Sequence, residues 1–142
     1  VDLRRHSRGD AVHTEHRVGE DVAVPRSRLV SYIAELNRMA RERKVRLKVV
    51  AHAGDGNLHP TFWVDKTEGR AGLQRLDAAL DESIALALTM GGTITGEHGV
   101  GQFKLRWLAQ EQQEEVLELQ RRIKSVFDPA GILNPGKAIL AR

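Results

Sequence analysis

Apolar residues recur at helical spacing in three parts of the chain. The first set follows Pro25, which suits the start of a helix because its missing N–H is not needed there, and comprises Leu29, Val30, Ile33, Leu36 and Ala40. The second comprises Leu73, Leu76, Leu80, Ile84 and Leu88, and the third Val116, Leu119, Ile123 and Val126. This spacing predicts helices from about Arg26 to Lys44, from about Leu73 to Gly91-Gly92, and from about Glu111 to Phe127.

Between the first two helical segments, apolar residues recur at every second position. Apolar residues alternate along residues 45–53, and along residues 58–64 the side chains of Leu58, Pro60, Phe62 and Val64 share one face. This alternation predicts two half-buried strands, and the intervening Asp55-Gly56 predicts a tight hairpin. Residues 21–24 and 93–95 are shorter strand candidates. The resulting order of elements predicts an α+β domain with helices packed on one face of an antiparallel sheet.

Composition and charge narrow the functional classes. The chain contains no cysteine, which excludes a disulfide scaffold, thiolate zinc sites and a cysteine nucleophile. The net charge is +3, but no aromatic residues are interleaved among the arginines as a nucleic-acid-binding face would require. We therefore expect no nucleic-acid partner. We find no apolar run of membrane-spanning length and no leader pattern, and we expect a cytoplasmic protein. Residues 1–17 lack periodicity and predict an irregular lead-in to a domain over residues 18–142.

Two short stretches carry the candidate chemistry. In "HAGDGNLH" (52–59), a two-residue turn at Asp55-Gly56 would place His52 directly opposite His59, with Cβ atoms about 5 Å apart. Two imidazoles at that separation can share one divalent ion. In "GGTITGEHGVG" (91–101), Glu97 offers a carboxylate as third ligand, and His98 is then free to act as a general base. The alternative is two half-buried histidines bonded to backbone groups and an exposed Glu-His pair.

Three motifs in a fixed order reveal a resemblance to a known family. "HAGDGNLHP", "GGTITGEHGVG" and "FDPAGILNPGK", together with "EDVAVPRSRL" (20–29), resemble the C-terminal domain of the FAD-linked 2-hydroxyacid oxidoreductases. That vanillyl-alcohol-oxidase type family includes FAD-linked glycolate oxidase subunits, D-lactate dehydrogenases and D-2-hydroxyglutarate dehydrogenases. The resemblance covers residues 18–140 and implies part of a ferredoxin-like cap domain.

The resemblance also implies roles for particular residues. His52, His59 and Glu97 would hold a divalent metal, with zinc expected first and iron or manganese as alternatives. His98 would take the hydroxyl proton of a 2-hydroxyacid substrate while hydride passes to FAD. Thr61 would face the substrate, and two residues of "NPGK" would lie toward the flavin, namely Asn134 and Lys137. The implied partners are an FAD-binding domain and an electron-acceptor protein, which would allow peripheral association with a membrane.

The sequence departs from the family in one respect and leaves other functions open. No segment resembles the FAD-binding domain, so we expect the chain alone to be colourless and inactive. We also expect an open sheet edge, which favours a homo-oligomer. A small metal hydrolase could use the same His-His-Glu set to activate water. A third possibility is a non-catalytic oligomerisation module.

Overall fold

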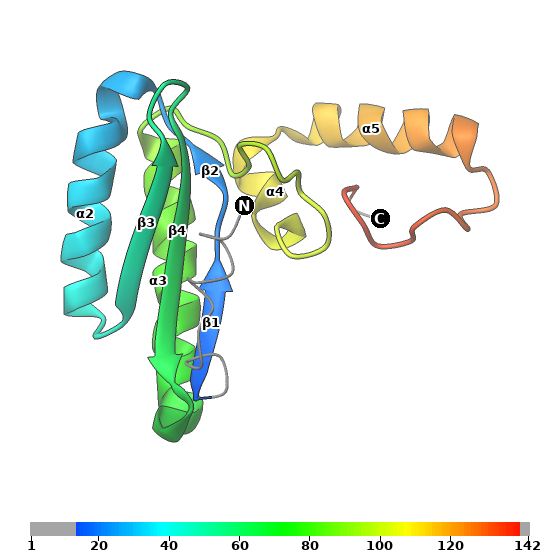
Figure 1. Ribbon diagram of the computed structural model, residues 1–142. Helices are drawn as coiled ribbons and strands as arrows, with labels where there is room; N and C mark the ends of the chain where they lie inside the picture. Colours follow the sequence, from blue (N-terminus) through cyan, green and yellow to red (C-terminus); the bar gives the residue numbers. More distant parts are fainter. Residues whose placement is uncertain (1–13, 140–142) are drawn as a thin grey trace, which may run out of the picture.

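The computed structural model describes residues 14–139 and is built around one antiparallel sheet (Figure 1). The central strand is β4 (Asn57–Asp65). Strand β3 (Arg46–His52) pairs with one side of β4. Strands β1 (Glu15–Gly19) and β2 (Val22–Ala23) pair one after the other with its second side.

Two helices cover one face of this sheet. Helix α2 (Leu29–Glu42) follows a 3-10 turn at Arg26–Arg28 and lies against β3, and helix α3 (Gly69–Thr89) lies against β4 (Figure 1). The core between them includes fully buried residues from helices and strands: Val22, Tyr32, Leu36, Leu58, Phe62, Val64 and Ile84. The predicted alternation along β4 is confirmed, because Leu58, Phe62 and Val64 point into this core. The predicted α+β class, with an antiparallel sheet and helices on one face, is therefore confirmed.

The hairpin between β3 and β4 differs from the predicted register. His52 pairs with Asn57, and His59 lies opposite Val50. Four residues make the turn, because the N–H groups of Asp55 and Gly56 both donate to the carbonyl of His52 at 3.2 and 3.1 Å. The predicted two-residue turn is wrong. The register moves by two residues, however, and since side chains alternate with a period of two, the histidines still share one face.

The first strand lies partly within the expected lead-in. Residues 15–17 belong to β1, so the prediction of irregular structure is wrong there; residues 1–13 lie outside the described part. Gly19 pairs with Thr61 and Val22 with Leu58, so β1 and β2 follow one continuous register. The chain between them therefore passes opposite Pro60 and His59. The Glu20 N–H donates to the Pro60 carbonyl at 2.7 Å, but proline has no N–H to return a bond, so the ladder is weakened where the strand is interrupted.

The second half of the chain adds two further helices beside the sheet. Helix α3 ends at Gly91-Gly92 as expected, with Gly91 at a φ of 79° and the Gly92 N–H bonded to the Ala87 carbonyl at 2.9 Å. The expected strand near Thr93 is reduced to a single bridge with Ala23. Helix α4 (Leu105–Glu111), which buries Trp107, has no counterpart in the prediction. Helix α5 (Glu114–Phe127) begins three residues later than expected.

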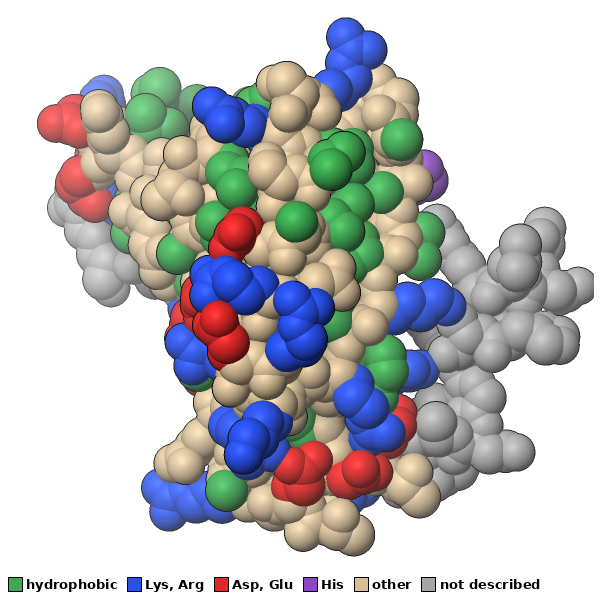
Figure 2. All heavy atoms as spheres, turned by 90° about the vertical axis from the view of Figure 1, so that its left-hand side faces the viewer, with side chains coloured by type: hydrophobic (Ala, Val, Ile, Leu, Met, Phe, Trp, Pro, Cys, Tyr) green, Lys and Arg blue, Asp and Glu red, His purple; other side chains and the backbone are tan. Residues whose placement is uncertain are grey.

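Lysine and arginine side chains on the outer side of α2 are interspersed with acidic ones (Figure 2). Arg38 bonds Glu35 and Glu42, and Arg43 pairs with Glu82 on α3 at 2.5 Å. This side of the molecule therefore presents mixed charge and no continuous basic band. Among the described residues, no helix combines the length and apolar character needed to cross a bilayer.

Candidate functional site

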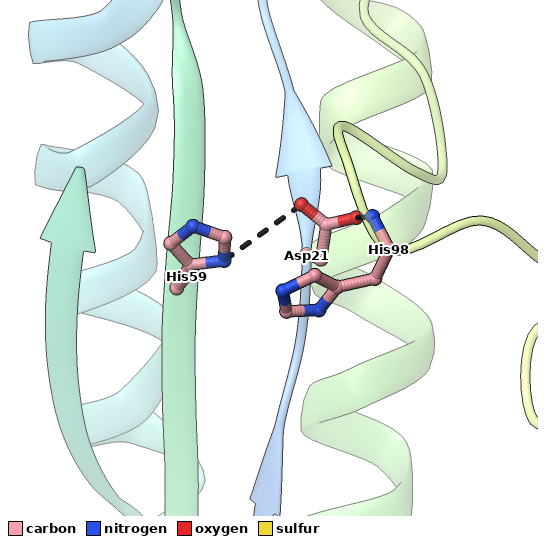
Figure 3. A group of neighbouring side chains, drawn as sticks. All are labelled: Asp21, His59 and His98. Atoms are coloured by element: carbon pink, nitrogen blue, oxygen red, sulfur yellow. Dashed lines mark hydrogen bonds and ion pairs between the residues drawn. The ribbon is translucent and has the colours of Figure 1, made fainter. Parts of the chain in front are cut away.

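The candidate site lies on the sheet face opposite α2 and α3, where four segments meet; Figure 3 shows Asp21, His59 and His98 from three of them. Strand β4 contributes His59, and the end of β3 contributes His52. The interruption between β1 and β2 contributes Asp21, and the loop after Thr95 contributes Glu97 and His98. The site is therefore assembled by strand pairing and by one loop that folds over it.

The structure brings together His52, His59 and Glu97. Their candidate ligand atoms all lie within 4.8 Å of one another. The Glu97 Oε1 atom is 3.3 Å from His59 Nε2 and 3.8 Å from His52 Nε2. The two imidazoles meet edge to face, with ring centroids 5.2 Å apart. A small shift of these side chains would direct two imidazole nitrogens and one carboxylate oxygen at a common point.

The environment of His59 suits coordination of a metal. Its side chain is only 18% exposed, and within residues 14–139 neither ring nitrogen has a hydrogen-bond partner. Burial lowers the pKa of His59, and the neighbouring His98 and His52 lower it further, against the opposite effect of two carboxylates. The imidazole is thus kept neutral, which is the form that binds metals. Buried nitrogens without partners and facing a carboxylate fit a divalent ion such as zinc.

His98 lies beside this group with a more exposed side chain. Its imidazole stacks on that of His59 with centroids 5.0 Å apart, and its Nε2 atom is 3.6 Å from Glu97 Oε1. The His98 side chain is 58% exposed. The His98 imidazole is therefore open to solvent beside His59 and Glu97.

Asp21 anchors the loop that carries Glu97 and His98, and sequence reasoning missed it. The backbone N–H groups of Gly96, Glu97 and His98 donate to Asp21 Oδ2 at 2.9, 3.0 and 2.8 Å. Burial raises the pKa of Asp21, but the N–H groups of His98 and Glu97, the charge of Lys104 and the Thr95 hydroxyl together lower it below its usual value. The sequence signal for Asp21 was the acidic pair Glu20-Asp21 in "EDVAVP". In a strand, adjacent side chains point to opposite faces, so one of these two acids had to lie on the same face as the histidines.

A buried lysine lies behind this carboxylate. Lys104 donates hydrogen bonds to the carbonyls of Asp21 and Ile94, and its Nζ is 3.7 Å from Asp21 Oδ2. On the other side, Nζ is 4.0 Å from Glu20 Oε2. Burial raises the pKa of Glu20 to about 7, even though Lys104 and Arg106 act in the opposite direction. Lys104 thus holds the interrupted strand against the loop.

The other candidate residues are Thr61 on β4 and two residues of the C-terminal segment, Asn134 and Lys137. Thr61 lies two residues after His59 on β4, so both side chains are on the same face of the sheet. Thr61 pairs with Gly19 on β1 and with Lys48 on β3. Lys137 donates to Gln102 at 3.3 Å, and Ala138 bonds the Gly101 carbonyl, so the C-terminal segment returns to the loop after His98. Asn134 is exposed, with a φ of 45°, and is not part of the histidine group.

Comparisons with known proteins show which family the chain resembles. Residues 10–138 match the family described as "FAD linked oxidases, C-terminal domain". The chain is 40% identical over 118 residues to the glycolate oxidase subunit GlcD of Bacillus subtilis. It is 41% identical over 121 residues to the mitochondrial D-lactate dehydrogenase [cytochrome] of Arabidopsis thaliana. It is 39% identical over 119 residues to the D-lactate dehydrogenase of Archaeoglobus fulgidus.

These alignments cover most of the chain but a small part of each relative. They include 83%, 84% and 84% of the chain, and 25%, 21% and 26% of the respective relatives. The chain thus spans about a quarter of the length of these curated relatives. The resemblance inferred from the three motifs is confirmed: the chain belongs to the family of FAD linked oxidases, C-terminal domain.

Proposed function

We propose that this chain is the substrate- and metal-binding part of an FAD-dependent enzyme that oxidises a 2-hydroxyacid to a 2-oxoacid. The observation that carries the proposal is the convergence of His52, His59 and Glu97, with His98 at its edge. The relatives named glycolate oxidase subunit and D-lactate dehydrogenase supply the substrate class. An FAD-binding domain is the expected partner, and an electron-acceptor protein would reoxidise the flavin.

His52, His59 and Glu97 would hold the divalent ion. Two neutral imidazoles and one carboxylate leave positions open for substrate, as in catalytic zinc sites and in non-haem iron sites. Zinc is the first expectation, with iron or manganese as alternatives. Bound metal supplies positive charge that favours ionisation of the substrate hydroxyl. The half-exposed side chains of His52 and Glu97 leave this point open to solvent.

His98 would take the proton of the substrate hydroxyl. Oxidation of a 2-hydroxyacid removes a hydride from C2 and a proton from oxygen, and a C=O bond forms. Bound FAD supplies the acceptor for the hydride. The exposed imidazole of His98 is next to Glu97 and can accept the proton as a general base. Thr61 would face the substrate from β4, and Asn134 and Lys137 would face the flavin.

The metal site is tested by measuring zinc binding to the full 142-residue chain by competition with a chromophoric chelator. We expect one equivalent to bind, and Glu97→Gln to weaken binding by roughly 100-fold or more, because a ligand is lost. Glu115→Gln, at an exposed carboxylate on α5, is the matched control and should bind as the wild type does. Absence of zinc binding, or equal affinity in the Glu97 variant, would contradict the site.

The redox role is tested by combining the chain with the FAD-binding domain of a relative. Flavin absorbance should then bleach on addition of glycolate or D-lactate under anaerobic conditions. The chain alone should be colourless and leave both substrates unchanged. Hydroxyacid oxidation by the chain alone would contradict this division of roles, and so would the absence of flavin reduction in the combined protein.

A further inference from the structure

Asp21 lies between β1 and β2, directly opposite His59 on the neighbouring strand β4. The registers of β1 and β2 on β4 place residue 21 opposite residue 59. Asp21 is buried, with a side chain 1% exposed, and its Oδ1 atom lies 3.7 Å from His59 Nδ1 (Figure 3). Glu97 lies on the other side of the same imidazole, 3.3 Å from Nε2. The ring of His59 is therefore placed between two carboxylates.

The two oxygens of Asp21 differ in what they already bind. Oδ2 accepts from the N–H groups of Gly96, Glu97 and His98 and from the Thr95 hydroxyl, at 2.8–3.1 Å. A carboxylate offers only about four lone-pair positions in total. Oδ1 accepts one bond, from the Glu97 N–H at 3.2 Å. Oδ1 is thus the oxygen with remaining capacity, and it is the one that faces His59.

Asp21 also takes part in a second grouping of candidate ligand atoms. Asp21, His59 and His98 also have candidate ligand atoms within 4.8 Å of one another. An ion there would take Asp21 Oδ1, because this is the oxygen that faces His59 Nδ1. An ion held by the group with Glu97 would instead lie beside His59 Nε2 and would leave Asp21 Oδ1 free to accept from Nδ1.

We infer that Asp21 is a positioning residue that holds His59 with a proton on Nδ1 and a free lone pair on Nε2, directed at the metal. This inference rests on the proposed metal site. A histidine ligand commonly donates its second ring N–H to a carboxylate, which fixes the tautomer and the ring orientation. The same Asp21 side chain also fixes the loop, because it accepts hydrogen bonds from the backbone N–H groups of Glu97 and His98. One buried carboxylate thus orients His59 and the loop that carries Glu97 and His98.

The variant Asp21→Asn makes this inference testable, because asparagine has only one oxygen. Gly96, Glu97 and His98 all present N–H groups to the Oδ2 position, so the amide oxygen must take that position. The NH₂ group then faces His59 Nδ1 and donates to it. The proton of the neutral imidazole must move to Nε2, where it blocks coordination.

The experiment measures the His59 tautomer by ¹⁵N NMR of the histidine-labelled, metal-free chain at alkaline pH, and zinc affinity by chelator competition. We expect the Nδ1–H tautomer in the wild type, the Nε2–H tautomer in Asp21→Asn, and zinc binding about 10- to 100-fold weaker in the variant. Glu20→Gln is the matched control, because Glu20 is the adjacent buried acid and lies on the core side; it should keep the wild-type tautomer and affinity.

An Nε2–H tautomer in the wild type would overturn the inference even if Asp21→Asn failed to fold. Unchanged tautomer and affinity in a folded Asp21→Asn variant would also overturn it. A tautomer switch in a chain that binds no zinc would refute the proposed metal site and leave the orienting role of Asp21 intact. The two proposals therefore fail in distinguishable ways.

Discussion

Gly96 lies against the side chain of Asn57 with no room for a β-carbon. A Cβ at position 96 would be 2.3 Å from Asn57 Oδ1 and 2.8 Å from Asp21 Oδ1. Asn57 is itself buried, at the start of β4 and paired with His52. The close approach of Gly96 brings the loop with Glu97 and His98 down onto the sheet.

Gly96→Ala should therefore push this loop away from the sheet. We expect a loss of about 1–3 kcal/mol in the free energy of unfolding, the usual cost of a forced overlap in a packed region. Zinc affinity should fall as well, because Glu97 moves away from His59. Urea unfolding and chelator competition measure the two effects. Gly54→Ala is a suitable control, since a Cβ there meets no atom within 4 Å; equal effects of both substitutions would contradict the explanation.

His98→Gln should slow hydroxyacid oxidation in a protein that combines this chain with an FAD-binding domain. Loss of a positioned general base typically lowers kcat by about 10²–10⁴-fold. Zinc affinity should change little, because His98 is outside the proposed ligand set. Stopped-flow flavin reduction measures the rate. A rate like that of the wild type would show that another group takes the proton.

Glu20 should make stability depend on pH. Its pKa is raised from 4.5 to about 7 in the folded chain, so between these values the folded state binds more protons than the unfolded state. Stability contributed by this group is complete below pH 4.5 and is lost as pH rises through 7. The shift corresponds to about 3 kcal/mol. Chemical unfolding at pH 4 and pH 8 should show that Glu20→Gln removes this part of the dependence; identical profiles for variant and wild type would contradict it.

The exposed apolar face of α5 should promote self-association. Val126 and Phe127 are 76% and 79% exposed, and Ile132 in the following segment is 74% exposed. A second copy of the chain can cover this surface, and the outer edge of β3, unpaired within the described residues, offers another contact. Light scattering at micromolar concentration should give a mass above that of the monomer. Val126→Asp should lower this mass.

Val30→Asp provides the control for that experiment. Val30 is 79% exposed but lies on α2, away from α5, so its substitution should leave the mass unchanged. A monomer mass for the wild type across the whole concentration range would defeat the prediction. Equal effects of the two substitutions would show that association is not specific to α5.

The common face of His52 and His59 could be predicted although their pairing could not. Alternation along β3 and β4 is a local property, and it survives a register shift of two residues. The turn is set by Gly56, whose φ is 80° and whose Cβ would lie 2.2 Å from the Val24 carbonyl. That close contact comes from a residue more than thirty positions away, so no local turn pattern reveals it.

Long-range contacts also explain the elements that the sequence did not predict. Strand β1 reads "EHRVG", which has little strand character by itself and forms a strand because β4 offers it a free edge. Helix α4 has only seven residues, too few for a clear period, and is held by burial of Trp107 and its bond to Asp81. The role of Asp21 depends on a loop about 75 residues later.

Asp21 and His98 are far apart in the sequence, and this separation affects when the site forms during folding. Their hydrogen bond joins positions 77 residues apart, and closing so long a segment carries an entropy cost that only a nearly complete fold can offset. The cluster should thus be among the last features to form and the first to be lost on unfolding. An ion held there would bind the native chain and not its partly folded forms, so scarcity of the metal would shorten the lifetime of the protein as well as slow its chemistry.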